Sequence, residues 1–369
     1  TTSGKATSES TSTSWQESGN ATSPAPPRSS ASVTTTNEAG SQDLRACAAR
    51  PRAFTAPIRL VSQAASSRPP LHFDESTTPS PVDSTSGRSH CSIADGWSQG
   101  RGMYGGVLLA QVARAAQQRL RDVSDADEPP TRRLRSINMS FLAPVSPGEV
   151  SLTTSILRSG SAVSHVRVEL RQGGESSGES ELRATAELTF GSGRAGVAQP
   201  APPRPATALP LECLPMKAFG GFTDHLEHRW TGTDALLSGA ARPVVQGWVR
   251  PRLPATVDAG LVVAMLDSFP PPVWCAVSTR CPAASLQLHM QLARDAVPHT
   301  PAAPAHPWFF YESRATLIGG GYSDIQGRLW LEDGTFLGLV TQCVVDFSER
   351  TLPARGRTAS SAHPHSHTS

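Results

Sequence analysis

The sequence lacks the features that mark a membrane protein, a nucleic-acid-binding protein or a metal centre. No apolar run approaches the roughly 18 residues that a membrane span needs. The 33 Lys and Arg nearly balance the 31 Asp and Glu, for a net charge of +2. Electrostatics therefore favours neither nucleic acid nor an anionic membrane as a partner. The six cysteines form no C-x-x-C pair, so we expect neither a disulfide framework nor a metal, and no cofactor.

Low-complexity sequence surrounds the part of the chain that has a regular pattern. Residues 1–70 are rich in Ser, Thr, Ala and Pro and are predicted to be disordered. Within them, residues 44–69 carry five arginines and no acid, a composition similar to an organellar transit segment, although a basic linker is the simpler interpretation. We expect a cytoplasmic protein, with a mitochondrial one as the alternative. The Pro-rich residues 192–210 are predicted to link two modules, and residues 351–369 to form a disordered tail.

Two blocks, residues 71–191 and 211–350, share one order of elements, in which an apolar helix is followed by four strands. The helices are predicted at Val107–Leu120, after the Gly-rich turn GRGMYGG, and at Val257–Phe269, before three prolines. The strands are predicted at Leu134–Leu142, Val150–Leu157, Ala162–Arg171 and Leu182–Phe190 in the first block, and at Ala284–Leu292, Trp308–Ile318, Ser323–Glu332 and Phe336–Phe347 in the second.

The character of these elements indicates how they pack. Both helices are apolar around most of their circumference, so each needs a broad cover rather than a single buried stripe. Strict alternation in Leu182–Phe190 is typical of a half-buried antiparallel strand. A curved antiparallel sheet wrapped around each helix meets both needs, and two such sheets can pair edge to edge. The pattern predicts an α+β tandem double hot-dog fold; the alternative is two unrelated α+β domains.

An ordered set of segments resembles the acyl-CoA thioesterase II family, over roughly residues 72 to 348. The segments are WSQGRGMYGG (97–106), FLAPVSPGEV (141–150), WVRPRLP (248–254), ASLQLHMQL (284–292) and GRLWLEDGTFLGLVTQ (327–342). The resemblance implies an acyl-CoA thioester hydrolase of fatty acid and lipid metabolism. Such an enzyme takes acyl-CoA as its partner and releases free acid and CoA without a cofactor.

The resemblance also implies a catalytic site in the second module, where an Asp, a hydroxyl residue and a Gln orient and activate a water. In this sequence those positions fall on Asp267 after the second helix, Ser285 in the strand that follows, and Gln342 in the last strand. Ser stands in place of the commoner Thr. Gln287 and His289 stand where the family often has Asp and His.

The three residues carry different weight on physical grounds. Thioester hydrolysis needs a base for the water and donors for the developing oxyanion. Asp267 follows six apolar residues, so burial can raise its pKa towards that of a base; the alternative is an Asp that only bonds the helix end. Gln342 lies in an apolar strand and needs partners, either a structural network or water and substrate. Ser285 alone is a weak indication.

The Gly-rich turn supplies two substrate-binding candidates in the first module, Tyr104 and Gly106. Glycine lets the backbone approach a thioester carbonyl, and the Gly106 N–H stands at a helix N-terminus. The alternative is a tight turn that needs Gly for its geometry. The first helix ends in Gln-Gln-Arg at 117–119 and has no counterpart of Asp267. One catalytic set per chain is therefore predicted.

Two functions stay open at this point. One is the thioesterase. The other is a non-catalytic double hot-dog protein that binds acyl-CoA or lipid, which the departures at Gln287 and His289 suggest. A hot-dog dehydratase would need an acid–base His in a helix, and neither helix has one. Assembly of further copies through the sheets is an additional expectation.

Overall fold

The computed structural model describes residues 69–83, 85–124, 132–173, 180–197, 199–232, 234–293, 297 and 305–347. The chain divides into Thr1–Leu60 and Val61–Ser369, and all of these residues belong to the second unit. The disorder predicted for residues 1–70 and 351–369 lies outside the described residues, apart from Pro69 and Pro70. No helix in the described ranges is long and apolar enough to cross a membrane.

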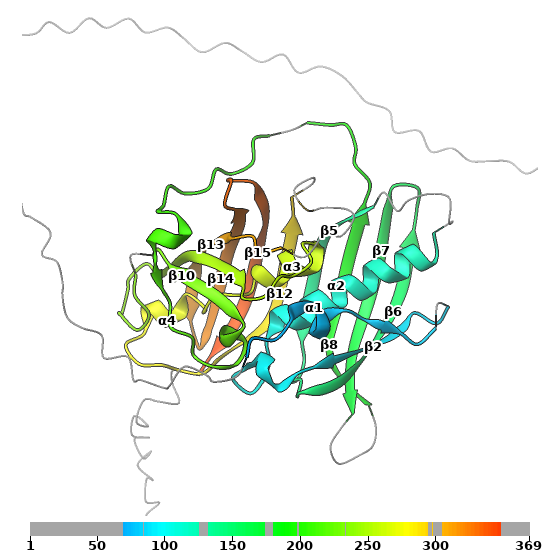
Figure 1. Cartoon of the computed structure of the whole chain (residues 1–369), viewed down its shortest axis with the longest axis horizontal. Coiled ribbons are helices and arrows are strands. Elements are labelled where there is room, and N and C mark those ends of the chain that lie inside the picture. Colours follow the sequence, from blue (N-terminus) through cyan, green and yellow to red (C-terminus); the bar gives the residue numbers. More distant parts are fainter. Residues whose placement is uncertain are drawn as a thin grey trace, which may run out of the picture. The chain divides into compact units, whose positions relative to one another are not determined.

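Within the described residues, 13 strands form one antiparallel sheet (Figure 1). A two-stranded hairpin, β3 (Ser98–Gln99) and β4 (Gly102–Met103), stands apart from it. In spatial order the large sheet runs β1 (Ser80–Pro81), β2 (Arg88–Ile93), β6 (Gly148–Ser159), β7 (Val163–Gly173), β8 (Ser180–Gly191), β5 (Arg133–Phe141), β12 (Ala283–Leu292), β15 (Phe336–Asp346), β14 (Tyr322–Leu331), β13 (Phe309–Gly319), β11 (Val244–Pro251), β10 (Leu226–Trp230) and β9 (Leu214–Pro215).

The two halves of this sheet meet at β5 and β12. Met139 pairs with Leu288, and Ile137 pairs with Met290, so the two edges continue one hydrogen-bonded ladder. Both sides of the junction are buried apolar residues. This edge-to-edge pairing confirms the predicted double hot-dog arrangement, and it removes two strand edges that would otherwise be exposed.

The long helix α2 (Gly105–Asp122) and the short helix α3 (Ala259–Met265) lie on the same face of the sheet and pack against each other (Figure 1). Helix α2 extends the predicted helix by two residues at each end, and every residue from Gly105 to Ala116 is buried. The need for a broad cover, inferred from its apolar circumference, is therefore met by the sheet and by α3 together.

Helix α3 is much shorter than the predicted Val257–Phe269. At its start, the Asp258 carboxylate accepts the Leu261 N–H at 2.8 Å and caps the helix, because Asp258 itself has extended backbone. At its end, the N–H groups of Asp267 and Ser268 bond three residues back, to Ala264 and Met265. Asp267 therefore lies in a tight turn beyond the helix, and not in its last turn.

A buried ion cluster ties the two helices to α1 (Phe73–Thr77). Arg114 of α2 donates to the Asp258 cap of α3 at 2.9 Å and to Asp74 of α1 at 2.8 Å. Asp74 in turn accepts the N–H and the hydroxyl of Thr256. The Arg114 side chain is only 8% exposed, so its charge depends on these partners.

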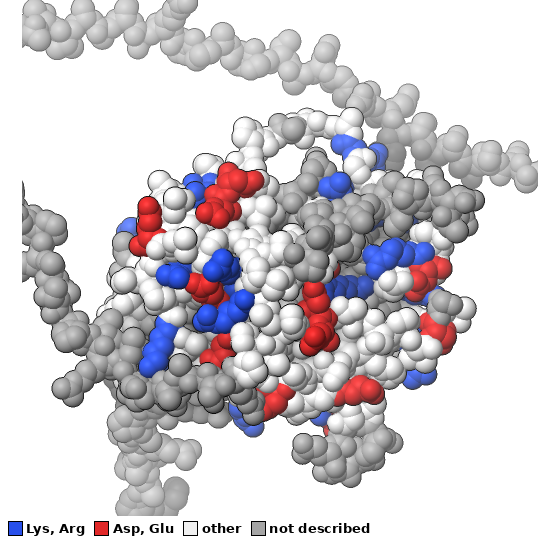
Figure 2. Space-filling view, viewed as in Figure 1, with Lys and Arg blue, Asp and Glu red and all other residues white. Residues whose placement is uncertain are grey.

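The remaining described helices are short. They are α4 (Val273–Ala276) and the 3-10 turns Asp95–Trp97, Pro210–Glu212 and Gly221–Asp224. On the face seen in Figure 2, acidic and basic side chains are interspersed between broad uncharged areas. This distribution agrees with the nearly balanced composition.

Candidate active site

Asp267, Ser285 and Gln342, the three residues expected to act on water, meet in the structure. The Gln342 amide Nε2 donates to Asp267 Oδ1 at 3.2 Å and to Ser285 Oγ at 2.5 Å. All three side chains are half-buried. One amide therefore joins a carboxylate and a hydroxyl that are 18 residues apart in the sequence.

A β-bulge directs Ser285 into this site. Ser285 and Leu288 are three residues apart, so in a regular strand they would point to opposite faces of the sheet. The pairing of β12 with β15 shifts between Ser285 and Gln287, and the extra residue, Leu286, is left exposed. Ser285 then faces the same side as Leu288, which lies directly opposite Gln342.

The carboxyl group of Asp267 has an unusual affinity for protons. Burial raises its pKa from an ordinary value near 4 to about 7, and the hydrogen bond from Gln342 acts in the opposite direction without cancelling the effect of burial. The turn that carries Asp267 follows the wholly buried helix α3. A carboxyl group with this pKa can accept a proton from water near neutral pH.

Helix α2 of the first module closes the other side of the site. A Cβ atom on Gly105 would lie 2.5 Å from Asp267 Oδ2 and 3.3 Å from Phe141 Cζ, so only glycine fits without a shift. The next residue, Gly106, lies in the first turn of α2, where backbone N–H groups have no partner within the helix. The positive end of an 18-residue helix thus lies beside the carboxyl group.

Tyr104 and Gly106, the substrate-binding candidates, contact each other. Tyr104 is fully buried, its hydroxyl donates to the Ala264 carbonyl, and its ring stacks on Phe222 with centroids 4.2 Å apart. A Cβ on Gly106 would lie 2.2 Å from the Tyr104 ring. The glycine therefore makes room for the ring, and Tyr104 holds α3 against α2. Contact of either residue with substrate stays a prediction.

Sequence reasoning missed His228, which supports the turn carrying Asp267. His228 lies on β10, is 3% exposed, and its Nε2 contacts the Ser268 carbonyl at 2.9 Å. Burial lowers its pKa to about 4, so the ring is neutral near pH 7 and Nε2–H is the donor. Phe269 packs edge-on against this ring and stacks on Tyr311. No local pattern in the sequence around His228 indicates this contact.

Among the described residues of the first module, no equivalent polar set stands at the matching strand positions. Its strands β5 and β8 pair Ile137 with Leu188, where β12 and β15 pair Leu288 with Gln342. Strand β5 also carries a bulge three residues before Ile137, at Leu134, which matches the place of Ser285. Leu134 and Leu188 are buried apolar residues. The register therefore gives apolar counterparts to Ser285 and Gln342.

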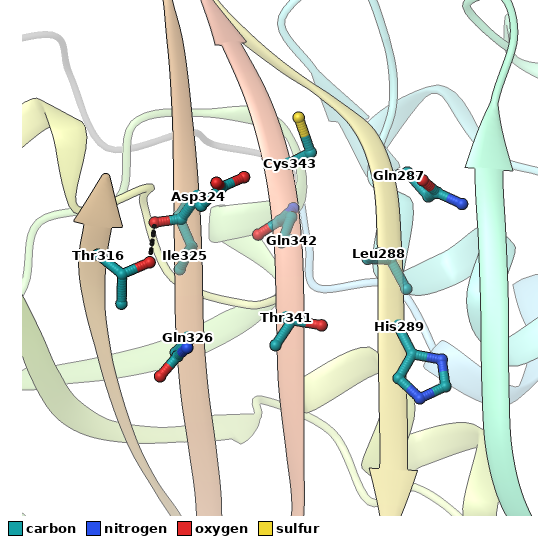
Figure 3. A pocket seen from close by; sticks show the side chains of 10 residues that line it. All are labelled: Gln287, Leu288, His289, Thr316, Asp324, Ile325, Gln326, Thr341, Gln342 and Cys343. Carbon is teal, nitrogen blue, oxygen red and sulfur yellow. Dashed lines mark hydrogen bonds between the residues drawn. The ribbon is translucent and has the colours of Figure 1, made fainter. Parts of the chain in front are cut away.

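A cavity of about 330 Å³ lies on the opposite, outer face of the sheet over β15 (Figure 3). Its lining includes the small side chains Thr341 and Cys343, with Gln287 and His289 on β12. Alternation along the strands turns these side chains away from Asp267. The two departures from the family pattern, at Gln287 and His289, therefore lie outside the site.

Within the described residues, no group of three or more His, Cys, Asp or Glu could hold a metal ion.

Comparison with known proteins finds matches to two consecutive parts of the chain. The family model for the acyl-CoA thioesterase N-terminal domain matches residues 93–191, and that for the C-terminal domain matches residues 197–345. An uncharacterised protein of Mycobacterium tuberculosis is 34% identical over 99 residues, which cover 26% of this chain and 33% of that protein. The match thus spans about a third of the length of that curated relative.

Two solved structures share the fold over most of the chain. A hot-dog protein from Alicyclobacillus acidocaldarius is 19% identical with a TM-score of 0.62, covering 74% of this chain and 97% of that one. An acyl-CoA thioesterase II from Mycobacterium marinum is 20% identical with a TM-score of 0.56, covering 74% and 97%.

Proposed function

We propose a hydrolytic function for this chain, which belongs to the acyl-CoA thioesterase II-like family. Thioesterase activity in general follows from that membership. The finer proposal is that the chain cleaves fatty acyl-CoA to free acid and CoA, with Asp267, Ser285 and Gln342 acting on one water. The observation that carries it is the Gln342 amide bonded to both Asp267 and Ser285, beside a carboxyl group whose pKa is about 7.

The proposed reaction begins with water between these side chains. Gln342 uses its N–H groups on Asp267 and Ser285, which leaves its carbonyl oxygen to accept one proton of the water. Asp267 removes the other proton as the water oxygen attacks the thioester carbonyl carbon. The Gly106 N–H and the dipole of α2 stabilise the oxyanion that forms. Collapse of this intermediate breaks the C–S bond, and the proton held by Asp267 passes to the CoA sulfur.

The site is shared between modules in this scheme. The base, the hydroxyl group and the amide come from the second module, while the oxyanion donor comes from α2 of the first. The acyl chain would lie along the apolar surface near Phe141, which already contacts Gly105. We propose that residues 71–191 act as this scaffold and residues 211–350 as the catalytic module.

Release of CoA from fatty acyl-CoA of several chain lengths tests the proposal. We expect Gln342→Ala to lower kcat/KM by about 100-fold or more, because the carboxylate and the hydroxyl lose their shared partner. Gln326→Ala is the matched control: it removes an exposed Gln from the outer face of the neighbouring strand and should leave kcat/KM unchanged. Equal activity of the two variants would exclude the proposed role of Gln342.

The alternative, a non-catalytic acyl-CoA-binding protein, was suggested by Gln287 and His289, which depart from the family pattern. The position of these two residues no longer supports it. Gln287 and His289 line the cavity on the outer face, where Gln287 bonds Asn138 and His289 bonds Gln291. The alternative would return if the wild-type chain bound acyl-CoA and released no free CoA.

A further inference from the structure

A ladder of aromatic side chains crosses the outer face of the second module. Trp248 of β11 lies opposite Phe310 of β13, Phe310 opposite Trp330 of β14, and Trp330 opposite Phe336 of β15. Neighbouring ring centroids are 5.1, 5.9 and 5.6 Å apart. We call these four residues the aromatic ladder.

The aromatic ladder faces away from the helices. Phe309 and Tyr311, on either side of Phe310, belong to the core around α3, so Phe310 points to the other face. The outer face of such a sheet is ordinarily polar and solvated. Here Trp248, Phe310 and Trp330 are at most 1% exposed, so something covers them.

The cover is the Pro-rich segment between the modules. The Trp330 indole N–H donates to the Pro202 carbonyl at 2.8 Å, and the Trp248 indole N–H donates to the Ala208 carbonyl at 3.0 Å. Between these two anchors, the Arg204 guanidinium lies 4.9 Å from the Trp248 ring centroid and 5.7 Å from that of Phe310. Tryptophan N–H groups and ring faces that hold a Pro-rich segment are the elements by which peptide-binding modules recognise such sequences.

The segment contacts the ladder with alternate residues. Pro202 and Arg204 are half-buried, while Ala201 and Pro203 between and before them are exposed. Arg204 Nε and Nη1 are buried and have no hydrogen-bond partner among the described residues. The guanidinium therefore contacts the ring faces of Trp248 and Phe310, which makes the interaction depend on an arginine at that place.

The sequence Pro-Ala-Pro-Pro-Arg of residues 200–204 also occurs at residues 24–28, outside the described residues. We propose that the aromatic ladder is a binding site for Pro-Pro-Arg peptides. Residues 200–208 are its resident ligand, and other peptides with the PAPPR sequence compete with them for the site. The segment between the modules is then a bound ligand as well as a spacer. This inference does not depend on the proposed hydrolysis.

A fluorescence titration tests competition directly. The probes are two synthetic peptides, with the sequences of residues 199–209 and 21–31, and each is compared with a version carrying Ala for its Arg. The protein is the full chain with Pro202→Gly and Arg204→Ala, which weaken the resident ligand. We expect both PAPPR peptides to shift the tryptophan emission saturably, with affinity about tenfold higher than for the wild-type chain. The Ala versions should bind about fivefold more weakly.

A second measurement uses the wild-type chain, in case the double variant does not fold. With 5-fluorotryptophan, excess PAPPR peptide should move the fluorine resonances of Trp248 and Trp330, assigned from Trp→Phe variants. The signals of Trp97 and Trp274, which lie outside the aromatic ladder, should stay in place. Binding that ignores the Arg, or resonances of Trp248 and Trp330 that do not move at saturating peptide, would overturn the proposal.

Discussion

At the scale of single residues, the protonation of Asp267 links the chemistry of the site to the stability of the fold. A carboxyl group whose pKa rises from about 4 to about 7 on folding binds its proton more tightly in the folded chain. The folded state is therefore favoured below pH 4, where both states are protonated. It loses stability as the pH rises from about 4 to 7, because only the unfolded chain releases the proton.

Asp267→Asn removes this penalty. The variant should be more stable than the wild type at pH 8.5, by up to about 4 kcal/mol, and about equally stable at pH 4, since a shift of one pKa unit corresponds to about 1.4 kcal/mol. Urea unfolding of both proteins at the two pH values measures the difference. A difference that does not change with pH would contradict the raised pKa.

His228 offers a second test at this scale. His228→Leu should lower kcat about tenfold with KM changed less than twofold, because the carbonyl of Ser268 loses its donor and Asp267 can shift. His228→Gln keeps an N–H donor at a similar reach and should recover most of kcat. The pH at which kcat/KM is half-maximal should move in the Leu variant only. Loss of stability with unchanged kcat and pH profile would mean that His228 only packs.

The roles of Gly105 and His228 could not have been found from local sequence. Asp267, Ser285 and Gln342 were identified through resemblance, and the structure brings them together. Gly105 and His228 act through space, from another helix and another strand, on a turn far along the chain. Only the three-dimensional contact reveals them.

At the scale of elements, sequence patterns predicted eight strands, whereas β2, β10 and β11 were not predicted. All eight predicted strands are present, with bounds within about two residues, because alternation reports a single buried face. Strand β11 has buried residues on both faces, with Val245 and Val249 inward and Trp248 under the Pro-rich segment, and its sequence shows no regular alternation. Helix α3 was overestimated because the apolar run continues past the point where backbone bonds end the helix.

The ion cluster around Arg114, which joins α2 to α1 and α3, should contribute strongly to the stability of the fold. Arg114→Met leaves the carboxylates of Asp74 and Asp258 without their charge partner, and should destabilise the chain by about 3–5 kcal/mol. Urea unfolding near pH 7 measures this loss. Arg167→Met, which breaks an exposed pair with Glu187, is the control and should change stability by less than about 1 kcal/mol. Similar losses in both variants would contradict the account.

At the scale of the whole molecule, the proposed site requires both modules. Gly105→Ala places a methyl group 2.5 Å from Asp267 Oδ2, so kcat/KM should fall by about 100-fold as the carboxyl group is displaced. Gly173→Ala, at a position where a Cβ meets no atom within 4 Å, should behave as wild type. Full activity of Gly105→Ala would mean that α2 does not close the site. Because the proposed site includes Gly105 of the first module, the sequence of the second module alone predicts only part of it.

The pH dependence of CoA release tests the central claim most directly, because it reports both the reaction and the residue that performs it. With fatty acyl-CoA as substrate, kcat/KM of the wild-type chain should rise with pH and reach half its plateau near pH 7, where Asp267 becomes ionised. Asp267→Asn should release CoA at least about 100-fold more slowly over the whole range. No CoA release by the wild type, or an Asp267→Asn variant with the same rate and profile, would contradict the account.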